Sequence, residues 1–473
     1  MVYHGRPSRN CLPCRRRKIR CDLNPIGCNQ CRRAKLICHG YRNPKELAFR
    51  DETRITTQKA EARRASTPQF TTTPQLSWDI LSRNAFLCLY IDRYSCGFNA
   101  LAPLLAASPA AGHLQASVGA VGLAFMALQE NRPDLMPLAN RQYLAAIQAI
   151  REAIHLTQQL ASNGTPQPVS DETLQSVLLL DLYEKLAIYH QWPGLPGSWL
   201  SHIQGALGMV QARPSADFRN PTTCQLASRT VIALTISCGA AGIPIPETLQ
   251  AIRKDLDGYV RNAKWTFIGL LMSVVNLRAH MRSAVLGSDD ILSRACELQD
   301  QLAFAESMIS RSWRPHRVLI NFHHTFIFDR YYDVYPSHYT VQVFNAFRIL
   351  RLEMCGIIRN LHPCSLVAKT IAKITSDICA AVPQFILPGA RPENTVPFSP
   401  LQILECRGIL TALYEAAQIT TDVLLRQWIL QCLAYMADNG IKMARDVAHI
   451  LTVTPEVDYW TVFAMVGSCG IIA

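Results

Sequence analysis

The feature that most constrains this chain is a pair of cysteine triplets near its N-terminus. The six cysteines form two copies of C-x2-C-x6-C, and each recurs 17 positions later in the second copy; they are Cys11, Cys14, Cys21, Cys28, Cys31 and Cys38. Basic residues repeat in the same register, because residues 15, 16 and 18 and residues 32, 33 and 35 are all Arg or Lys. A repeat that keeps both the thiols and the positive charge predicts two equivalent halves of one small module.

The cysteine spacing indicates how metal is held. Two cysteines three positions apart place two sulfurs on one ion, as in thiolate zinc sites. On one straight helix Cys14 and Cys21 would lie about 10 Å apart along the axis, too far for two sulfurs each about 2.3 Å from one zinc ion. A short helix that starts at Cys14 is therefore expected to end near Lys18 or Ile19, where the chain folds back. Three thiolates per half are too few for two separate four-coordinate ions, but six satisfy two ions if two sulfurs are shared.

Three other interpretations of the cysteines compete with this one. Disulfides fit poorly, because the N-terminus has no hydrophobic signal segment and the other 11 cysteines are scattered, many of them in apolar helical runs. That usage is typical of a reducing compartment, where such a cluster is metal-bound. A single four-cysteine zinc site leaves Cys21 and Cys38 without a role. Metal storage gives the basic residues no role. The spacing therefore favours a paired-zinc module.

This stretch resembles the fungal Zn2Cys6 binuclear cluster of transcription regulators, with all six cysteines at permitted spacings. The resemblance implies two zinc ions, bridged by Cys11 and Cys28. It also implies that Lys18 reads bases, that the first half enters the groove, and that a CGG-like triplet is the target. In one respect the sequence departs from the family, because Ile26 stands where a proline is usual and Pro25 precedes it. Gly27 is expected to provide the turn instead.

The basic residues of the module predict contacts with DNA. A lysine at a helix end in the major groove donates to guanine O6 and N7, which is the role expected of Lys18. The neighbouring arginines are expected to contact phosphates, which position the module without reading sequence. The predicted DNA-contacting residues are Lys18, Arg15, Arg16, Arg17, Arg20, Arg33 and Lys35. Two zinc ions and six thiolates carry a net charge of about −2, which some of these arginines are expected to offset.

The positive charge of the chain is confined to one end. The formal net charge is +12, and residues 1–66 alone hold 17 Lys/Arg against 5 Asp/Glu, so the remaining residues balance to zero. This asymmetry predicts a polyanion as partner of the N-terminal region only. The run Arg15–Arg20 also suits nuclear import, and the expected location is the nucleus.

The chain is expected to fall into four parts: a flexible arm over 1–10, the zinc module over 11–38, a helical tail and linker over 39–75, and an all-helical body over 76–473. The tail helix, starting at Asn43 and Pro44, lacks the heptads of a dimerising coiled coil. Apolar residues of the body recur every three or four positions, which predicts an all-α fold. The expected helices cover residues 77–94, 108–129, 133–160, 170–192, 199–213, 222–239, 265–284, 289–310, 316–334, 337–361, 364–387, 399–420 and 422–448. The sequence contains no run of 18 consecutive apolar residues, so a membrane span is not predicted.

The body resembles the regulatory domain of the same family, the fungal-specific transcription factor domain. Three passages carry this resemblance: residues 121–152, residues 199–206 and residues 242–247. The sequence contains neither a phosphate-binding glycine loop nor a nucleophile elbow, so neither motif indicates an enzyme. The pairs His323/His324 and Asp329/Asp333 lie among aromatic residues, so packing and capping are the expected roles. The cysteines of the body are expected in its core.

Taken together, these features predict a nuclear, zinc-dependent, sequence-specific DNA-binding transcription factor that regulates RNA polymerase II transcription. Its expected partners are double-stranded DNA and the transcription machinery, and the sequence leaves a homodimer and a small effector of the body open. The resemblance suggests, at the level of the family, regulation of a nearby biosynthetic gene cluster. Two alternatives stay open: a zinc-dependent scaffold that binds protein or RNA, and a helical enzyme with an appended zinc module.

Overall fold

The protein is described by a computed structural model in which residues 8–43, 57, 77–95, 97–161, 168–191 and 199–467 are placed. The chain separates into two compact units, Met1–Gln75 and Leu76–Ala473. The tail helix and linker predicted after the zinc module lie outside the described residues, apart from residues 39–43 and Thr57. Most of the predicted N-terminal arm also lies outside them.

The first unit is built on two short helices, α1 (Leu12–Arg16) and α2 (Asn29–Arg33), which contact each other. Each begins directly after the first cysteine of its repeat. The interior of this unit consists of cysteine side chains, against which Ile19 and Tyr41 pack. Helices of five residues are far too short to be stable alone, so this unit depends on what the cysteines hold.

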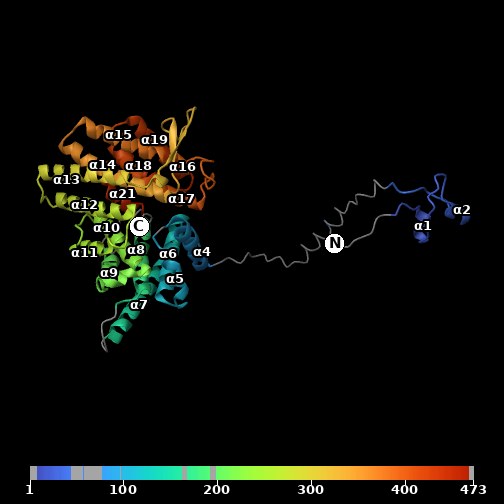
Figure 1. Ribbon diagram of the computed structural model, residues 1–473, viewed down its shortest axis with the longest axis horizontal. Coiled ribbons are helices and arrows are strands. Elements are labelled where there is room, and N and C mark those ends of the chain that lie inside the picture. Colours follow the sequence, from blue (N-terminus) through green and yellow to red (C-terminus); the bar gives the residue numbers. More distant parts are fainter. Residues whose placement is uncertain are drawn as a thin grey trace. The chain divides into compact units, whose positions relative to one another are not determined.

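The first half of the body is a stack of helices around α6 (Figure 1). Its elements are α4 (Trp78–Ala85), the π-helix η1 (Phe86–Tyr94), α5 (Leu101–Ala107), α6 (His113–Gln129), η2 (Pro133–Leu135), α7 (Met136–Ala161), α8 (Asp171–Gln191), α9 (Trp199–Gln211), η3 (Ser215–Arg219), α10 (Pro221–Ala241) and α11 (Glu247–Leu256). Helix α6 packs against α4, α7 and α8, and α8 packs on α9. The nearly all-round burial of α6 follows from a sequence that is apolar or small at almost every position.

Helix α10 is a central helix of the body. Asn220 caps its start by accepting the backbone N–H groups of Thr222 and Thr223, Pro221 stands in its first turn, and Gly242 ends it in a left-handed conformation. It is also long and apolar enough to cross a membrane by length and composition, but 78% of that apolar window is buried inside the body. Its contacts with α8, α9, α11, α12 and α21 account for this burial.

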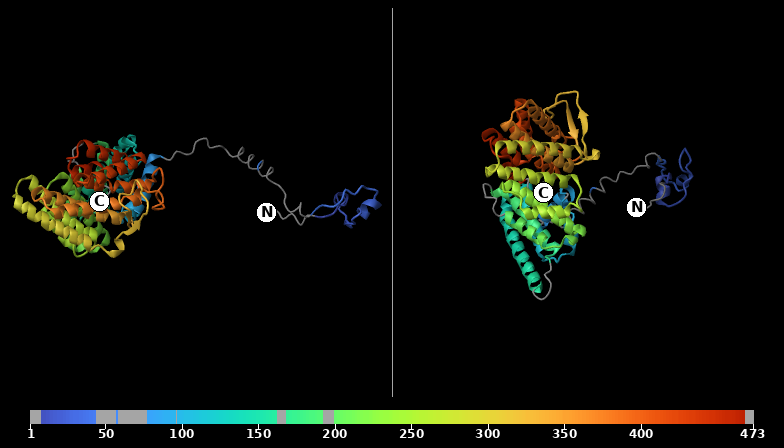
Figure 2. Two further views of the ribbon diagram at one scale, coloured as in Figure 1. Left: turned by 90° about the horizontal axis from the view of Figure 1, so that it is seen from above. Right: turned by 60° about the vertical axis from the view of Figure 1, so that its left-hand side comes forward.

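The second half of the body consists of the elements that follow α11 in the chain. Its elements are α12 (Ala263–Arg282), α13 (Ser288–Ser307), η4 (Arg311–Trp313), β1 (His316–Leu319), β2 (Tyr331–Val334), α14 (His338–Leu361), α15 (Ser365–Ala380), α16 (Pro383–Ile386), α17 (Pro400–Arg407), α18 (Leu410–Ile419), α19 (Val423–Asp438), α20 (Lys442–Val453) and α21 (Tyr459–Met465). Helices α12, α13 and α14 pack in succession, and α14 packs on α15 and α18. Helix α21 returns to contact α8 and α10, so both halves share one apolar core. Figure 2 shows the earlier, blue-to-green part of the body lying against the later, yellow-to-red part.

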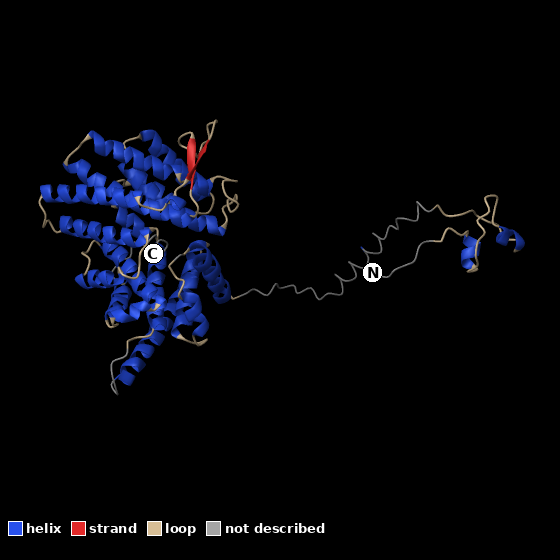
Figure 3. Cartoon of the chain, in the orientation of Figure 1, coloured by secondary structure: helices blue, strands red, loops and turns tan. Residues whose placement is uncertain are grey.

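Residues 316–334 were expected to be a helix, and this prediction is wrong. They form the antiparallel hairpin β1–β2, the two strands at the edge of an otherwise helical body (Figure 3). Arg317 pairs across the hairpin with Asp333, its Nε and Nη2 donating at 2.8 and 2.9 Å. Between the strands, the ring of Phe326 packs on Tyr435. Valine and tyrosine favour strands, and the aromatic residues that suggested a helical face instead anchor the hairpin to α19.

Several predicted helix boundaries are also wrong, because the pattern of apolar residues runs through breaks in the backbone. The helix expected over 364–387 divides before Pro383, the one over 399–420 divides between Arg407 and Leu410, and the one over 422–448 divides at Gly440, which has a φ of +109°. Helices α5, α11 and α21 were not predicted. A buried apolar residue on either side of a break continues a helical period, so periodicity alone does not reveal such breaks.

The class predicted from the sequence is confirmed: the protein is all-α, with a small cysteine-rich module and a large multi-helical body. The expectation that the cysteines of the body are core residues holds for some of them and fails for others. Cys238, Cys355, Cys379, Cys406 and Cys432 are buried, whereas Cys88, Cys296 and Cys364 are exposed and Cys224 is partly buried. The described cysteines form no disulfide.

Candidate metal centre and nucleic-acid interface

The six cysteine sulfurs of the first unit lie at distances that fit shared zinc ions. The Sγ atoms of Cys11 and Cys31 are 3.5 Å apart, as are those of Cys14 and Cys28. The sulfur of Cys21 is 3.5 Å from that of Cys28 and 3.7 Å from that of Cys11. Two thiolates on one tetrahedral zinc with bonds of about 2.3 Å lie about 3.8 Å apart. The cluster therefore has the dimensions of a metal centre, and folding back after α1 does bring Cys14 and Cys21 together, as predicted.

The sulfurs form two overlapping groups. One consists of Cys11, Cys14, Cys21 and Cys28, a full set of four ligands, and the other of Cys11, Cys31 and Cys38. Cys11 belongs to both groups, as a bridging thiolate must. Cys28 belongs to the first, and its backbone N–H donates to the Cys38 sulfur at 3.5 Å. Its role as the second bridge remains a prediction carried by the resemblance.

The electrostatics of the cluster distinguish Cys11 from its neighbours. Burial raises the pKa of the Cys14 thiol well above its ordinary value and that of the Cys31 thiol to about 12. Burial acts in the same direction on Cys11, but hydrogen bonds from the Cys14 backbone and from neighbouring thiols outweigh it and lower its pKa to about 6.

Both helices of the module end in the same way. In the first half, the Lys18 N–H bonds to the Arg15 carbonyl and the Ile19 N–H to the Cys14 carbonyl, both at 3.1 Å. In the second half, Lys35 and Leu36 make the equivalent bonds. This is the Schellman motif, which places one residue in the left-handed conformation that glycine usually occupies. Here the two residues are lysines, with φ of 52° at Lys18 and 53° at Lys35.

These helix ends correct one detail of the sequence-based expectation. Helix α1 begins at Leu12, two residues before Cys14, and ends at Arg16, followed by the cap residue Arg17. The reversal that brings Cys21 back occurs at Lys18. Pro13 stands in the first turn of α1, where its missing N–H costs nothing.

The loop between the halves is closed by Gly27, which was expected, and by a hydrogen bond between Tyr41 and Asn24, which was not. Gly27 provides the turn, as expected: its N–H bonds to the Asn24 carbonyl at 3.0 Å and its φ is +130°. Ile26, which replaces the usual proline, is fully exposed. The Tyr41 hydroxyl donates to the Asn24 carbonyl at 2.6 Å.

Asp22 connects the loop to α2. Both of its carboxylate oxygens accept the Asn29 N–H, at 3.2 and 3.0 Å. A hydrogen bond with Cys28 is the main cause of the lowered pKa of Asp22. The repeat has His39 at the corresponding place. Because the two copies of the repeat differ at this place, a comparison of the copies could have indicated that Asp22 has a role in the first half only.

The predicted DNA-contacting residues are mostly on the surface. Arg16, Arg17, Lys18, Arg20, Arg33 and Lys35 are exposed, whereas Arg15 is partly buried. The Nε of Arg15 is buried and has no hydrogen-bond partner within the part of the chain that the structure describes. That position suits a guanidinium that offsets the charge of the thiolates better than one that contacts phosphate.

Comparison with known proteins supports this interpretation of the module. Residues 9–47 match the family described as the fungal Zn(2)-Cys(6) binuclear cluster domain. No curated protein and no solved structure matches the chain. The family match identifies the class: a zinc-binding, DNA-binding transcription factor whose module binds two zinc ions. Members of this family are typically not enzymes. When bound, the zinc ions supply the cross-links that a core of thiols lacks.

Proposed function

We propose that the protein is a nuclear regulator of RNA polymerase II transcription whose zinc module reads CGG-like triplets through Lys18, and whose helical body is the regulatory domain of the family. The observation that carries the base-reading role is the exposed lysine held just beyond the end of α1, in a left-handed conformation that Lys35 shares in the second half. A residue with a Cβ pays about 1–2 kcal/mol in the left-handed region, and Gly would avoid this cost. Strain of this kind concentrates at functional sites. Because glycine would relieve the strain, we infer that lysine occupies this position for its exposed side chain.

The surroundings of Lys18 support the same role. It follows Arg17, the cap residue of α1, and its side chain is exposed, as are those of Arg16 and Arg17. Major-groove readout requires a donor at a helix end that reaches guanine O6 and N7. Transcription machinery as a partner, and control of a biosynthetic gene cluster, are further parts of the proposal that rest on the family resemblance.

A matched pair of variants tests base reading by Lys18. In Lys18→Gly and Lys35→Gly the same side chain is removed from the same motif in each half, and both changes relieve the left-handed strain. We expect Lys18→Gly to lose about 1–3 kcal/mol of discrimination between a CGG duplex and a scrambled one. Lys35→Gly should weaken binding to both duplexes alike, as loss of a phosphate contact does. The measurement is fluorescence anisotropy of the zinc-loaded chain at fixed salt.

The same titration separates the alternative function. A zinc-dependent scaffold for protein or RNA would bind both duplexes equally in the wild type. Equal effects of the two variants on the CGG preference would contradict base reading by Lys18 in particular. Binding to either duplex should fall steeply with salt concentration, because each neutralised phosphate releases counterions.

A further inference from the structure

Three cysteines of the body approach one another from different parts of the chain. Cys296 belongs to α13, Cys355 belongs to α14, and Cys364 is the N-cap residue of α15. Cys296 and Cys364 are exposed, whereas Cys355 is only 1% exposed. All three are free thiols in the structure. Their positions on neighbouring helices indicate which of the two exposed thiols is the partner of the buried one.

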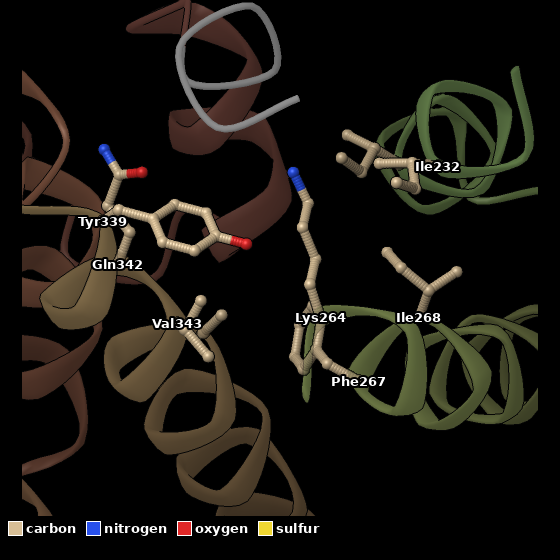
Figure 4. A pocket seen from close by; sticks show the side chains of 9 residues that line it. Ile232, Lys264, Phe267, Ile268, Tyr339, Gln342 and Val343 are labelled. Atoms are coloured by element: carbon tan, nitrogen blue, oxygen red, sulfur yellow. The ribbon is translucent and has the colours of Figure 1, made fainter. Parts of the chain in front are cut away.

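Helix α12 fixes the level of the residues on α14. The first turns of the two helices face each other, because Phe267 and Val343 line the same small pocket (Figure 4). Further along both helices, Arg278 of α12 donates to Glu353 of α14. Helices α12 and α14 therefore run in the same direction. Cys355 follows Glu353 by about 3 Å along the axis, so it is level with the end of α12.

Helix α13 runs the opposite way and brings Cys296 to the same level. Its C-terminal part and the start of α12 line one hollow. Its N-terminal part meets the end of α12, where His280 and Arg294 line another hollow. Cys296 follows Arg294 by two residues. Cys296 and Cys355 are thus both level with the last turns of α12.

Both cysteines also lie on the sides along which α13 and α14 pack. Arg351 of α14 donates to Glu306 of α13 at 2.6 Å. Cys355 follows Arg351 by one turn, so it points toward α13 as well. On α13, Ala295 precedes Glu306 by about three turns, and this alanine is fully buried. Cys296 is next to Ala295, at the exposed edge of the side that faces α14.

The packing of α13 on α14 allows a cross-link at this level. Packed helices have axes about 8–10 Å apart, and each Cα lies about 2.3 Å from its axis. Cα atoms on facing sides are therefore roughly 4–6 Å apart, within the span of a disulfide. Cys364 lies farther along, because α14 continues to Leu361, about 9 Å beyond Cys355, before the chain turns into α15.

The surroundings of the thiols give them different chemistry. Burial raises the pKa of Cys355 to about 11, against the charges of Arg351 and Arg359. The charges of Cys296 and Cys364 act in the same direction as burial. Cys355 is therefore a protonated thiol at neutral pH and is protected from direct oxidation, because the thiolate is the nucleophile. An oxidant in solution reaches the exposed Cys296 first, with Cys355 beside it.

We propose that Cys296 and Cys355 are a redox-active pair, which a hydroperoxide converts to a disulfide that joins α13 to α14. The thiolate of Cys296 attacks the peroxide: an S–O bond forms, the O–O bond breaks, and the leaving alkoxide or hydroxide takes the proton that Cys296 gave up. The sulfur of Cys355 then attacks that of Cys296, so the S–S bond forms and the oxygen leaves as water with the proton of Cys355. The two thiols supply the two electrons that reduce the peroxide. In a reducing compartment such a disulfide is transient.

The test is disulfide mapping of the folded, zinc-loaded full chain after treatment with tert-butyl hydroperoxide and alkylation of the remaining thiols. Trypsin places the three cysteines on separate peptides, residues 295–311, 352–359 and 360–369. We expect mass spectrometry to find 295–311 joined to 352–359, and dithiothreitol to release both. Cys296→Ser should lose this pair. Cys88→Ser removes an exposed thiol of η1 and should leave the yield of the pair unchanged.

A second variant tests the order of the two steps. In Cys355→Ser the oxidised Cys296 has no thiol to condense with, so dimedone, which labels sulfenic acids, should label Cys296 at least ~5-fold more than in the wild type. Circular dichroism confirms that each variant is folded. Absence of the linked pair in the wild type, a pair that joins 352–359 to 360–369 in its place, or unchanged dimedone labelling would overturn the proposal. The mapping involves no DNA, so its result is independent of the function proposed for the zinc module.

Discussion

Several helices of this protein end with a residue in the left-handed conformation, and the identity of that residue differs from one helix to another. Helix α10 ends in a Schellman motif like those of the zinc module, because Gly242 and Ile243 bond back to Gly239 and Cys238, both at 3.1 Å. At the end of α10 the left-handed position is occupied by glycine, with a φ of 67°. At the end of α12 it is occupied by Ala284, with a φ of 52°, and in the zinc module by Lys18 and Lys35. A residue with a side chain therefore occurs at this position in both units, and in the proposed function the side chain of Lys18 faces DNA.

Glu415 is a residue whose ionisation should control stability. It is 6% exposed on α18, and its Oε2 has no hydrogen-bond partner within the described residues. Burial, and then the charges of Glu353 and Asp458, raise the pKa of Glu415 to about 8 from an ordinary value of 4.5. Between these two pH values the unfolded chain carries the ionised carboxylate and the folded chain the neutral one. The folded state therefore loses stability as pH rises from about 5 to 8.

The substitution Glu415→Gln removes this ionisation. We expect the variant to match the wild type near pH 5 and to exceed it at pH 8 by on the order of 1–3 kcal/mol, because a tenfold change in the acid dissociation constant between the unfolded and folded chain corresponds to about 1.4 kcal/mol. The measurement is urea unfolding of the full chain, followed by tryptophan fluorescence at both pH values. A gain in stability of the same size at pH 5 and pH 8 would show that packing, not charge, is responsible.

At the scale of elements, the ends of helices are where sequence-based prediction succeeded and failed. The start and stop of α10 could be predicted because Asn220, Pro221 and Gly242 are strong local signals. The hairpin over 316–334 could not, since its aromatic residues pack on α19, which lies about 100 residues further along the chain. A local pattern does not reveal a distant partner. Capping residues bond to backbone groups only a few positions away in the chain, so helix ends of this kind can be predicted from the sequence.

Gly242→Ala tests the contribution of one helix end. A Cβ at this position adopts a strained φ and overlaps the guanidinium of Arg282. We expect a loss of about 1–2 kcal/mol in the free energy of unfolding, from backbone strain and the displacement of Arg282. The control is Gly205→Ala on α9, where a Cβ meets only open space. It should stabilise the protein by about 0.5–1 kcal/mol, as expected for Ala in place of Gly within a helix. If both variants lose stability equally, the conformation of Gly242 is not the cause.

At the scale of the whole molecule, the two units are stabilised by different means. The body has one continuous apolar core that includes none of the zinc ligands. The module has a core of cysteines and two helices of five residues each. Metal affinity is therefore expected to supply folding free energy to the module, whereas burial of apolar residues stabilises the described part of the body.

Zinc removal tests this division. A strong chelator should release two zinc ions per chain, abolish DNA binding, and leave the far-ultraviolet circular dichroism of the protein almost unchanged, because nearly all of the helical residues that the structure describes belong to the body. Adding zinc back should restore DNA binding. Metal analysis, circular dichroism and anisotropy on one sample give all three readings. A large loss of helical signal on chelation would mean that the body also depends on metal, and one zinc ion per chain would contradict the shared cluster.

The sequence alone predicted the six cysteines as the ligand set, and it determined the class of the zinc module and the largely helical character of the body. These depend on short-range spacing: cysteines three and seven positions apart, and apolar residues at helical intervals. The tertiary structure decided what depends on contacts between distant segments. It placed Cys11 in both sulfur groups, set Asp22 against Asn29, turned residues 316–334 into a hairpin, and brought Cys296 and Cys355 to one level on neighbouring helices. Periodicity in the sequence predicts which face of a helix or strand is buried, but only the tertiary structure shows which other element that face contacts.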